Sequence, residues 1–315
     1  MVTANQVIDL TTRLPGLTLK NPILSASGTY GYTIEFDDLM DISSIGAVVT
    51  KAISLKPREG NNHLRIFETE AGMINSIGLE NLGVKRFLAE KVPVLDANNV
   101  GYIMNLAGST LEEYVDLAKI CEGAKIKAVE LNVSCPNVKS GCLEFGVDEE
   151  SLYTLVKSVR EEYSGTLVVK LTPNVTSIEK LGVAAQNAGA DVLSAINTVK
   201  AMGLKLEYLN GKFKKTMIQG GLSGKAIKPI ALGAVRRLSQ AVDIPIIGIG
   251  GIATFEDVME FFAVGADAVQ IGTANFTHPN ACEIIVKELT DFMLKNGFKN
   301  IDELKLELRG AINEQ

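Results

Sequence analysis

The chain has 315 residues, of which 46% are hydrophobic, and it carries a formal net charge of −6. A chain of this length can bury a full core without disulfide bonds, and the length is normal for a single α/β barrel. The acidic balance argues against a nucleic-acid partner, because nucleic-acid binding needs a basic surface.

The N-terminal residues, MVTANQVIDL, contain neither a basic segment nor a long apolar segment, so no signal peptide is expected. No stretch of the chain approaches the ~18 unbroken apolar residues of a membrane span. We therefore expect a cytoplasmic protein without a membrane partner. Residues 7–20 place the turn LPGL between alternating runs, which predicts a hairpin that closes the bottom of a barrel.

Eight short apolar runs rich in β-branched residues follow along the chain. Near-continuous apolar runs are typical of strands buried on both faces, as in a parallel sheet. The predicted strands are 22–27, 47–52, 101–106, 128–133, 167–172, 192–197, 245–250 and 268–273. Helical patterns fall between most of them, at 111–122, 149–162, 177–188, 229–241 and 254–264, and a last helix is expected at about 282–295.

This alternation favours a closed (β/α)8 barrel, the TIM barrel, over an open doubly wound sheet. No interdomain linker interrupts it, so we expect residues 1–315 to form one domain. The connections 53–83 and 199–224 are too long for simple βα loops, and 136–147 is a third loop of medium length. The second connection contains Asn210-Gly211, which predicts a hairpin turn.

Polar residues collect at the carboxyl ends of the predicted strands, where a β/α barrel builds its active site. They are Ser27, Lys51, Asn105, Asn132, Lys170, Asn197 and Thr198. A buried lysine such as Lys170 needs an anionic partner or loses its proton. A flavin offers N1 and O2, which gain negative charge on reduction, whereas Schiff-base chemistry is the rival role for such a lysine.

Glycines follow the last two strands, as Gly248-Ile249-Gly250-Gly251 and Gly272-Thr273. The loops after these strands form the usual phosphate site of a β/α barrel, and glycine lets backbone amides approach a phosphate closely. The spacing is not that of a Rossmann fingerprint. The pattern therefore predicts a phosphorylated ligand without naming it.

Cys135 follows the fourth strand in the sequence NVSCPN, between Asn132 and Asn137. The two asparagines can bind a planar, amide-rich substrate with donors and acceptors. A thiol with a reference pKa near 8.5 can remove a weakly acidic C–H proton if an acceptor takes the other hydrogen as hydride. We interpret Cys135 as a catalytic base; no histidine lies near it in sequence, which weakens a protease-like Cys/His interpretation.

The composition predicts no metal site. The four cysteines form no Cys-x-x-Cys pair, and the chain has two histidines. Neither a zinc ribbon nor an iron–sulfur site is therefore expected in this chain.

These motifs strongly resemble those of the dihydroorotate dehydrogenases, and the similarity covers essentially the whole chain. NVSCPN at 132–137 is the most specific of them. The others are LPGL at 14–17 with KNP at 20–22, ASG at 26–28, TKA at 50–52, NSIGL at 75–79, INT at 196–198, GGLSG at 220–224 and the two late glycine motifs.

The resemblance implies FMN as cofactor and oxidation of (S)-dihydroorotate to orotate in pyrimidine synthesis. It implies that Cys135 takes the proton from C5 while hydride passes from C6 to flavin N5, and that the loop 136–147 closes over the substrate. The substrate residues it implies are Lys51, Asn75, Ser76, Ile77, Gly78, Leu79, Asn132, Asn197 and Thr198. The FMN residues it implies are Ser27, Lys51, Ala52, Asn105, Asn132, Lys170, Ile196, Gly224, Gly250, Gly251, Gly272 and Thr273.

The branch of the family follows from the same resemblance. Quinone-linked members use serine as base and carry an N-terminal membrane helix pair, and this chain shows neither. The text GGLSGKAIKP at 220–229 is most similar to the NAD-linked branch. That branch implies a homodimer joined to two subunits that carry FAD and a [2Fe–2S] cluster and reduce NAD⁺. The connection after Asn197 looks about two residues longer than in that branch, which could alter the partner surface.

Four alternatives stay open. Fumarate could be the direct electron acceptor, as in the other soluble branch. The chain could also be another flavin barrel that acts on a pyrimidine ring, a flavin-free phosphate-binding barrel or a lysine aldolase.

Overall fold

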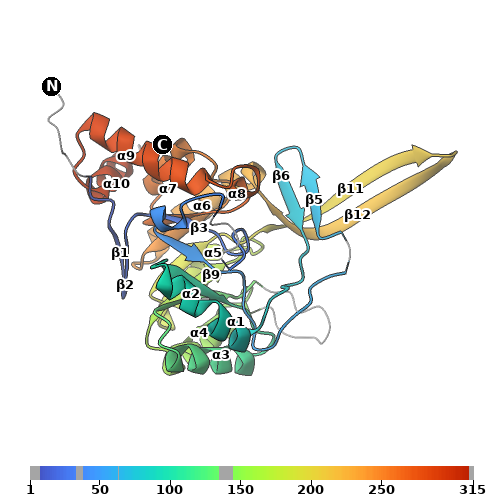
Figure 1. Ribbon diagram of the computed structural model, residues 1–315, viewed down its shortest axis with the longest axis horizontal. Coiled ribbons are helices and arrows are strands. Elements are labelled where there is room, and N and C mark those ends of the chain that lie inside the picture. Colours follow the sequence, from blue (N-terminus) through green and yellow to red (C-terminus); the bar gives the residue numbers. More distant parts are fainter. Residues whose placement is uncertain (1–7, 33–37, 63, 135–144, 312–315) are drawn as a thin grey trace.

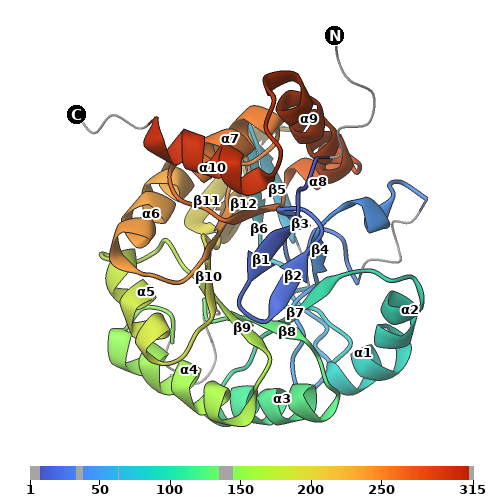
Figure 2. The same cartoon turned by 90° about the vertical axis from the view of Figure 1, so that its left-hand side faces the viewer.

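Eight parallel strands close into a barrel in the computed structural model, which describes residues 8–32, 38–62, 64–134 and 145–311. Each strand pairs with the next along the chain, and the last pairs with the first, so the predicted TIM barrel is confirmed and the open sheet is excluded (Figure 2). The strands are β3 (Ile23–Ser25), β4 (Ala47–Val49), β7 (Tyr102–Leu106), β8 (Ala128–Asn132), β9 (Thr166–Leu171), β10 (Val192–Ala195), β13 (Ile246–Ile249) and β14 (Ala268–Ile271).

Helices surround the barrel on its outer face (Figure 2). Those that the sequence predicted are α3 (Leu111–Gly123), α4 (Glu149–Glu162), α5 (Ile178–Asn187), α6 (Lys228–Ala241), α7 (Phe255–Ala263) and α9 (Ala281–Asn296). The structure adds α1 (Val84–Glu90), α2 (Val92–Ala97), α8 (Ala274–Thr277), α10 (Ile301–Gly310) and the 3-10 helices η2 (Ile42–Ser44) and η3 (Lys225–Ile227). Within the described ranges, no helix combines the length and the hydropathy that a membrane crossing requires.

Local sequence explains where these helices start and stop. The Thr110 side chain accepts a hydrogen bond from the backbone N–H of Glu113 at the start of α3. Thr254 and Asp257 form a reciprocal capping box at the start of α7. At the end of α9, Gly297 adopts a φ of 80°, the left-handed conformation that glycine accommodates without strain.

An N-terminal hairpin closes the amino end of the barrel, as predicted. Its strands β1 (Thr12–Leu14) and β2 (Leu17–Leu19) are antiparallel, and Thr166 of β9 donates a hydrogen bond of 2.8 Å to the carbonyl of Pro15 in the turn. The hairpin leucines pack with side chains from the interior of the barrel. This buried cluster includes Leu14, Leu19, Leu24, Val49, Ile103, Ala128, Val168, Val192, Ile247 and Ala268.

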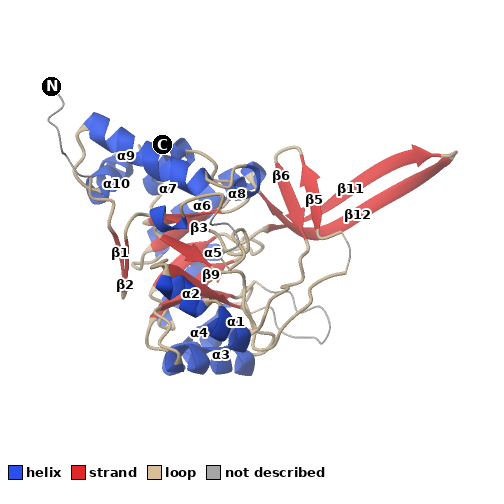
Figure 3. Cartoon of the chain, in the orientation of Figure 1, coloured by secondary structure: helices blue, strands red, loops and turns tan. Residues whose placement is uncertain are grey.

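A four-stranded antiparallel sheet is inserted at the other end of the barrel (Figures 1 and 3). The two long connections form it, in the order β11-β12-β6-β5. The predicted turn at Asn210 and Gly211 joins β11 to β12, and both residues have positive φ angles. The β11–β12 hairpin projects beyond the rest of the molecule (Figure 1). The strands are β5 (Ile66–Thr69), β6 (Gly72–Asn75), β11 (Val199–Leu209) and β12 (Lys212–Ser223).

Candidate active site

A cavity lies at the carboxyl ends of the barrel strands, with the inserted sheet as one wall. Its lining from the sheet includes Ile66, Met73 and Asn75. The following predicted site residues also line it: Ser27, Ile77, Lys170, Ile196, Asn197, Thr198, Gly224, Gly250, Gly251, Gly272 and Thr273. The structure thus brings together most of the residues predicted for substrate and FMN, although they come from both halves of the chain.

Gly250 and Gly251, in the turn on one side of this cavity, leave no room for side chains. Gly250 and Gly251 have φ angles of 130° and 76°. A Cβ on Gly251 would lie 2.7 Å from the Cβ of Lys228 and 3.0 Å from the carbonyl oxygen of Gly224. Glycine is therefore required at both positions, and a turn without side chains lets backbone amides approach an anionic group closely, as a phosphate site requires.

A cluster of charged side chains lies next to the turn at Gly250 and Gly251, since Lys228 packs against Gly251. The Lys228 ammonium lies 2.6 Å from Asp257 Oδ1 and 2.8 Å from Glu260 Oε2. Asp257 Oδ2 accepts hydrogen bonds from the backbone N–H groups of Ala253 and Thr254. Burial raises the pKa of Asp257, but the hydrogen bonds from Lys228 and these amides outweigh burial, so the net shift of the pKa is downward.

Amide side chains form the part of the site nearest to β8. Asn197 donates a hydrogen bond of 3.2 Å from Nδ2 to Asn132 Oδ1 and accepts one of 2.8 Å from the backbone N–H of Thr198. Asn75 Nδ2 donates to the carbonyl of Gly221, which fixes the amide at the edge of the sheet. Together these groups can present donors and acceptors to a planar ligand with amide edges.

Polar side chains also lie deeper, inside the barrel. Asn105 is fully buried, and its Nδ2 donates to Glu130 Oε1 over 2.7 Å. The Lys170 ammonium lies 3.9 Å from the same carboxylate oxygen. Asn105 Oδ1 is buried without a hydrogen-bond partner among the described residues. A buried polar atom without a partner is costly, so this atom is suited to a ligand that brings a donor into the barrel mouth, as a flavin ring does.

Sequence reasoning missed three members of this interior group: Glu130, Ser194 and Gln270. All three are fully buried in barrel strands. The available signal was a polar letter inside an apolar run, as in AVELNV, VLSAIN and AVQIGT. The prediction considered only the polar residues at the strand ends, so it did not include these three.

Other predicted residues lie beside the cavity rather than in its lining. The Lys51 ammonium is 3.5 Å from Glu80 Oε2. The positive charge of Lys51, and to a smaller extent that of Arg65, lowers the pKa of the Glu80 carboxyl. Burial raises this pKa, but the two charges outweigh it, so the pKa lies below its usual value. Ala52 is buried one residue further along the chain. The ion pair with Glu80 helps to hold the Lys51 ammonium in this position.

The segment 75–79 is held by Asn61. Asn61 Nδ2 donates to both the carbonyl and the Oγ of Ser76. A Cβ on Gly78 would lie 2.6 Å from the backbone nitrogen of Asn61, and Leu79 has a φ of 56°. Ser76, Gly78 and Leu79 therefore shape the loop that carries Asn75 and Ile77 into the cavity lining.

The predicted base, Cys135, and most of the loop 136–147 lie outside the described residues. Cys121 and Cys282 are buried, and burial raises the pKa of each thiol to about 12. Neither can supply a thiolate at neutral pH. No cluster of three or more metal-ligating side chains occurs in the ranges that the structure describes.

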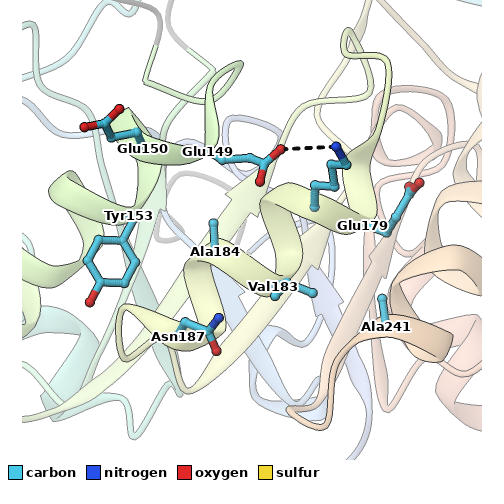
Figure 4. Close-up of a pocket in the computed structure, with 9 residues that line it drawn as sticks. Glu149, Glu150, Tyr153, Glu179, Val183, Ala184, Asn187 and Ala241 are labelled. Carbon is cyan, nitrogen blue, oxygen red and sulfur yellow. Dashed lines mark ion pairs between the residues drawn. The ribbon is translucent and has the colours of Figure 1, made fainter.

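A second hollow lies on the outside of the barrel, between α4 and α5 (Figure 4). Its volume of about 510 Å³ exceeds the 200 Å³ of the cavity at the mouth. Its lining consists of helix side chains, among them the Lys180–Glu149 ion pair at 3.8 Å and Tyr153. Volume does not decide which of the two hollows is the candidate active site. The strand-end polar groups and the constrained glycine turns lie at the mouth of the barrel, so we assign the site there.

Comparison with known proteins agrees with the geometry. A model of the dihydroorotate dehydrogenase family matches residues 9–293. The catalytic subunit of dihydroorotate dehydrogenase B (NAD(+)) from Caldicellulosiruptor bescii is 47% identical over 306 residues, which cover 97% of this chain and 100% of the relative. The subunits of the same name from Geotalea daltonii and Geobacter sulfurreducens are each 46% identical over 297 residues, covering 94% of this chain and 97% of the relative. The chain is therefore an oxidoreductase that belongs to the dihydroorotate dehydrogenase family.

Proposed function

We propose that this chain oxidises (S)-dihydroorotate to orotate in pyrimidine biosynthesis, with FMN bound at the barrel mouth. The observation that carries the proposal is the single cavity that gathers amide side chains on one side and glycine turns on the other. The names of the relatives support the substrate. We further propose that residues 1–315 act as one FMN-binding domain located in the cytoplasm.

The residues at the mouth suit a flavin mononucleotide. The turns at Gly224, Gly250 and Gly251 would hold the phosphate, and Lys170 and Asn105 would contact the ring. Asn105 Oδ1, buried and without a partner among the described residues, is the acceptor that such a ring would satisfy. FMN, when bound, supplies a site that accepts a hydride from the substrate.

The remaining chemistry belongs to side chains of the chain. Asn75, Asn132 and Asn197 bind and orient the amide edges of the substrate, and Thr198 supports Asn197. Cys135 removes the proton from C5, and the loop 136–147 excludes water during this step. Base catalysis of this kind contributes roughly a hundredfold to ten-thousandfold in rate.

The acceptor of the electrons is proposed from the relatives. Their name, catalytic subunit of an NAD(+) enzyme, implies a separate partner. We propose that the partner carries FAD and a [2Fe–2S] cluster and passes electrons to NAD⁺, and that two copies of this chain form the core of a heterotetramer.

The β11–β12 hairpin is the surface that we assign to contact between the two copies. One face of the hairpin presents large apolar side chains to solvent, which is typical of an interaction site. Five lysines and one glutamate lie between residues 199 and 223, whereas the whole chain carries a net charge of −6. The basic hairpin is therefore complementary in charge to the rest of a second copy. The exposed apolar side chains are Met202, Leu204, Leu206, Tyr208, Phe213 and Met217.

The function is tested by anaerobic reduction of the purified chain after loading with FMN. We expect dihydroorotate to bleach the flavin absorbance, while dihydrouracil, the same ring without the carboxylate, leaves it unchanged. Added NAD⁺ should not reoxidise the isolated chain, because the partner subunit is missing. A protein that stays colourless with FMN would support the flavin-free barrel, and rapid reoxidation by fumarate would favour the fumarate-linked branch.

The contact between copies is tested separately by sedimentation. The pair Leu204→Lys and Leu206→Lys should convert a dimer to a monomer, because two charges would enter the apolar face. The exposed Leu306 on α10 provides the control, since Leu306→Lys should leave the dimer intact. A wild-type chain that sediments as a monomer at micromolar concentration would contradict the assignment.

A further inference from the structure

One buried carboxylate connects four strands beneath the cavity. Glu130 of β8 has no exposed surface. Its Oε1 accepts from Asn105 Nδ2 of β7 at 2.7 Å and lies 3.9 Å from the Lys170 ammonium of β9. Its Oε2 accepts from Ser194 Oγ of β10 at 2.8 Å and from Gln270 Nε2 of β14 at 2.7 Å.

The four groups around the Glu130 carboxyl group turn N–H or O–H donors toward its two oxygens, and this arrangement suits a carboxylate, which accepts at both. Burying a charge is costly unless it is paired and hydrogen-bonded, and this cluster meets both conditions. The fold thus keeps one negative charge at the centre of the barrel, where an apolar side chain could otherwise pack.

Two of the partners of Glu130, Asn105 and Lys170, are among the residues that we expect to hold FMN. Lys170 lines the cavity, and the free oxygen of Asn105 is without a partner among the described residues. Glu130 is therefore placed one contact away from the ligand. It fixes the orientation of the Asn105 amide and offsets the positive charge of Lys170.

We propose that Glu130 is a positioning residue that sets the reduction potential of the bound flavin through Asn105 and Lys170. This inference rests on the proposed binding of FMN at the mouth. A reduced flavin carries more negative charge than an oxidised one, and Lys170 favours the reduced form. The negative charge of Glu130 weakens that preference, so the carboxylate keeps the flavin able to pass electrons onward.

The test is the midpoint potential of bound FMN, measured against reference dyes in wild type and Glu130→Gln. The amide keeps the size of the side chain and removes its charge. We expect the ratio of FMN dissociation constants, oxidised over reduced, to rise about tenfold, which for a two-electron couple is an increase of about 30 mV. A role in stability alone would lower the melting temperature and leave the potential of the loaded protein unchanged.

Thr166→Val is the matched control, because Thr166 is a buried polar residue on the same strand as Lys170 but at the amino end. The control should lower the melting temperature and leave the potential at the wild-type value. A potential in Glu130→Gln that stays within threefold of wild type on the same ratio would overturn the proposal.

A second variant decides the matter if Glu130→Gln gives no soluble protein. The pair Ser194→Ala and Gln270→Met removes both donors from Glu130 Oε2 and leaves the carboxylate charge less neutralised. The ratio should then fall by about threefold, opposite to the effect of Glu130→Gln, and an unchanged ratio would count against the proposal. Failure of the wild-type chain to bind FMN would instead refute the proposed function.

Discussion

The two ends of the same eight strands differ in chemistry. At the amino end the interior is filled by apolar side chains under the β1–β2 hairpin, among them Leu14 and Leu19. At the carboxyl end the strands finish in amides, a lysine and glycine turns around a cavity. The difference separates two properties: substitutions at the amino end should change stability, and substitutions at the carboxyl end should change ligand binding and reaction rate.

The largest effect is expected for Cys135→Ala. Loss of the proposed base should slow bleaching of the flavin by dihydroorotate about a thousandfold, equivalent to about 4 kcal/mol in the barrier, while FMN stays bound. Stopped-flow absorbance measures the rate. Cys142→Ala in the same loop is the control and should retain the wild-type rate; an unchanged rate in Cys135→Ala would remove the assignment of the base.

The next effect concerns the amino end. Leu19 is 2% exposed, so Leu19→Ala should lower the free energy of unfolding by about 3 kcal/mol, because the lost burial and the resulting cavity both cost energy. Urea unfolding measures the change. The dissociation constant of FMN should stay the same. Leu306→Ala, at an exposed position, should change stability by less than about 0.5 kcal/mol. Weakened FMN binding in Leu19→Ala would contradict the division of stability and ligand binding between the two ends of the barrel.

Gly251→Ala tests the phosphate side of the carboxyl end. The added Cβ would lie 2.7 Å from Lys228 and would hold a φ of 76°, so the turn must shift. We expect FMN binding, measured by fluorescence quenching, to weaken about thirtyfold, or about 2 kcal/mol. Gly211 has the same φ of 76° but nothing within 4 Å, and Gly211→Ala should leave FMN affinity unchanged. Equal affinities in the two variants would show that the turn at Gly251 does not contact the ligand.

A smaller effect with a defined pH dependence is expected for Asp257. Its pKa is lower in the folded chain than the unfolded value of 3.8, because the bonds from Lys228 and two amides outweigh burial. The carboxylate therefore stabilises the fold above about pH 4, and this contribution disappears as the pH falls through the lower, folded pKa. Asp257→Asn should lose about 1 kcal/mol at pH 7 and approach wild type in acid. Thermal unfolding from pH 7 to 3 measures it, and a difference that is constant with pH would contradict the mechanism.

The smallest effect is an absence of reaction. Burial raises the pKa of Cys121 and Cys282 to about 12, so alkylating reagents at pH 8 should not modify them in the native chain. Mass spectrometry of labelled peptides should find Cys121 and Cys282 unmodified. Rapid labelling of Cys282 without unfolding would mean that the outer helices open more easily than their packing indicates.

The amino-acid sequence by itself determined the order of the eight barrel strands and of six of the helices, because continuous apolar runs and capping residues depend on near neighbours. It also located the glycine turns at 248–251 and 272–273 and the polar strand ends. These features depend on backbone geometry and strand period, which a residue and its neighbours largely decide.

Tertiary structure alone decided which distant residues meet. Of the two long connections, the sequence predicted only the hairpin turn at Asn210-Gly211. The structure joins them in the sheet β11-β12-β6-β5, because β12 pairs with β6, well over a hundred residues earlier in the chain. Lys51 gained Glu80 as a partner beside the cavity, and Glu130 gained donors from four strands. Such contacts form only when the barrel closes, since closure brings residues distant in sequence to within hydrogen-bond distance.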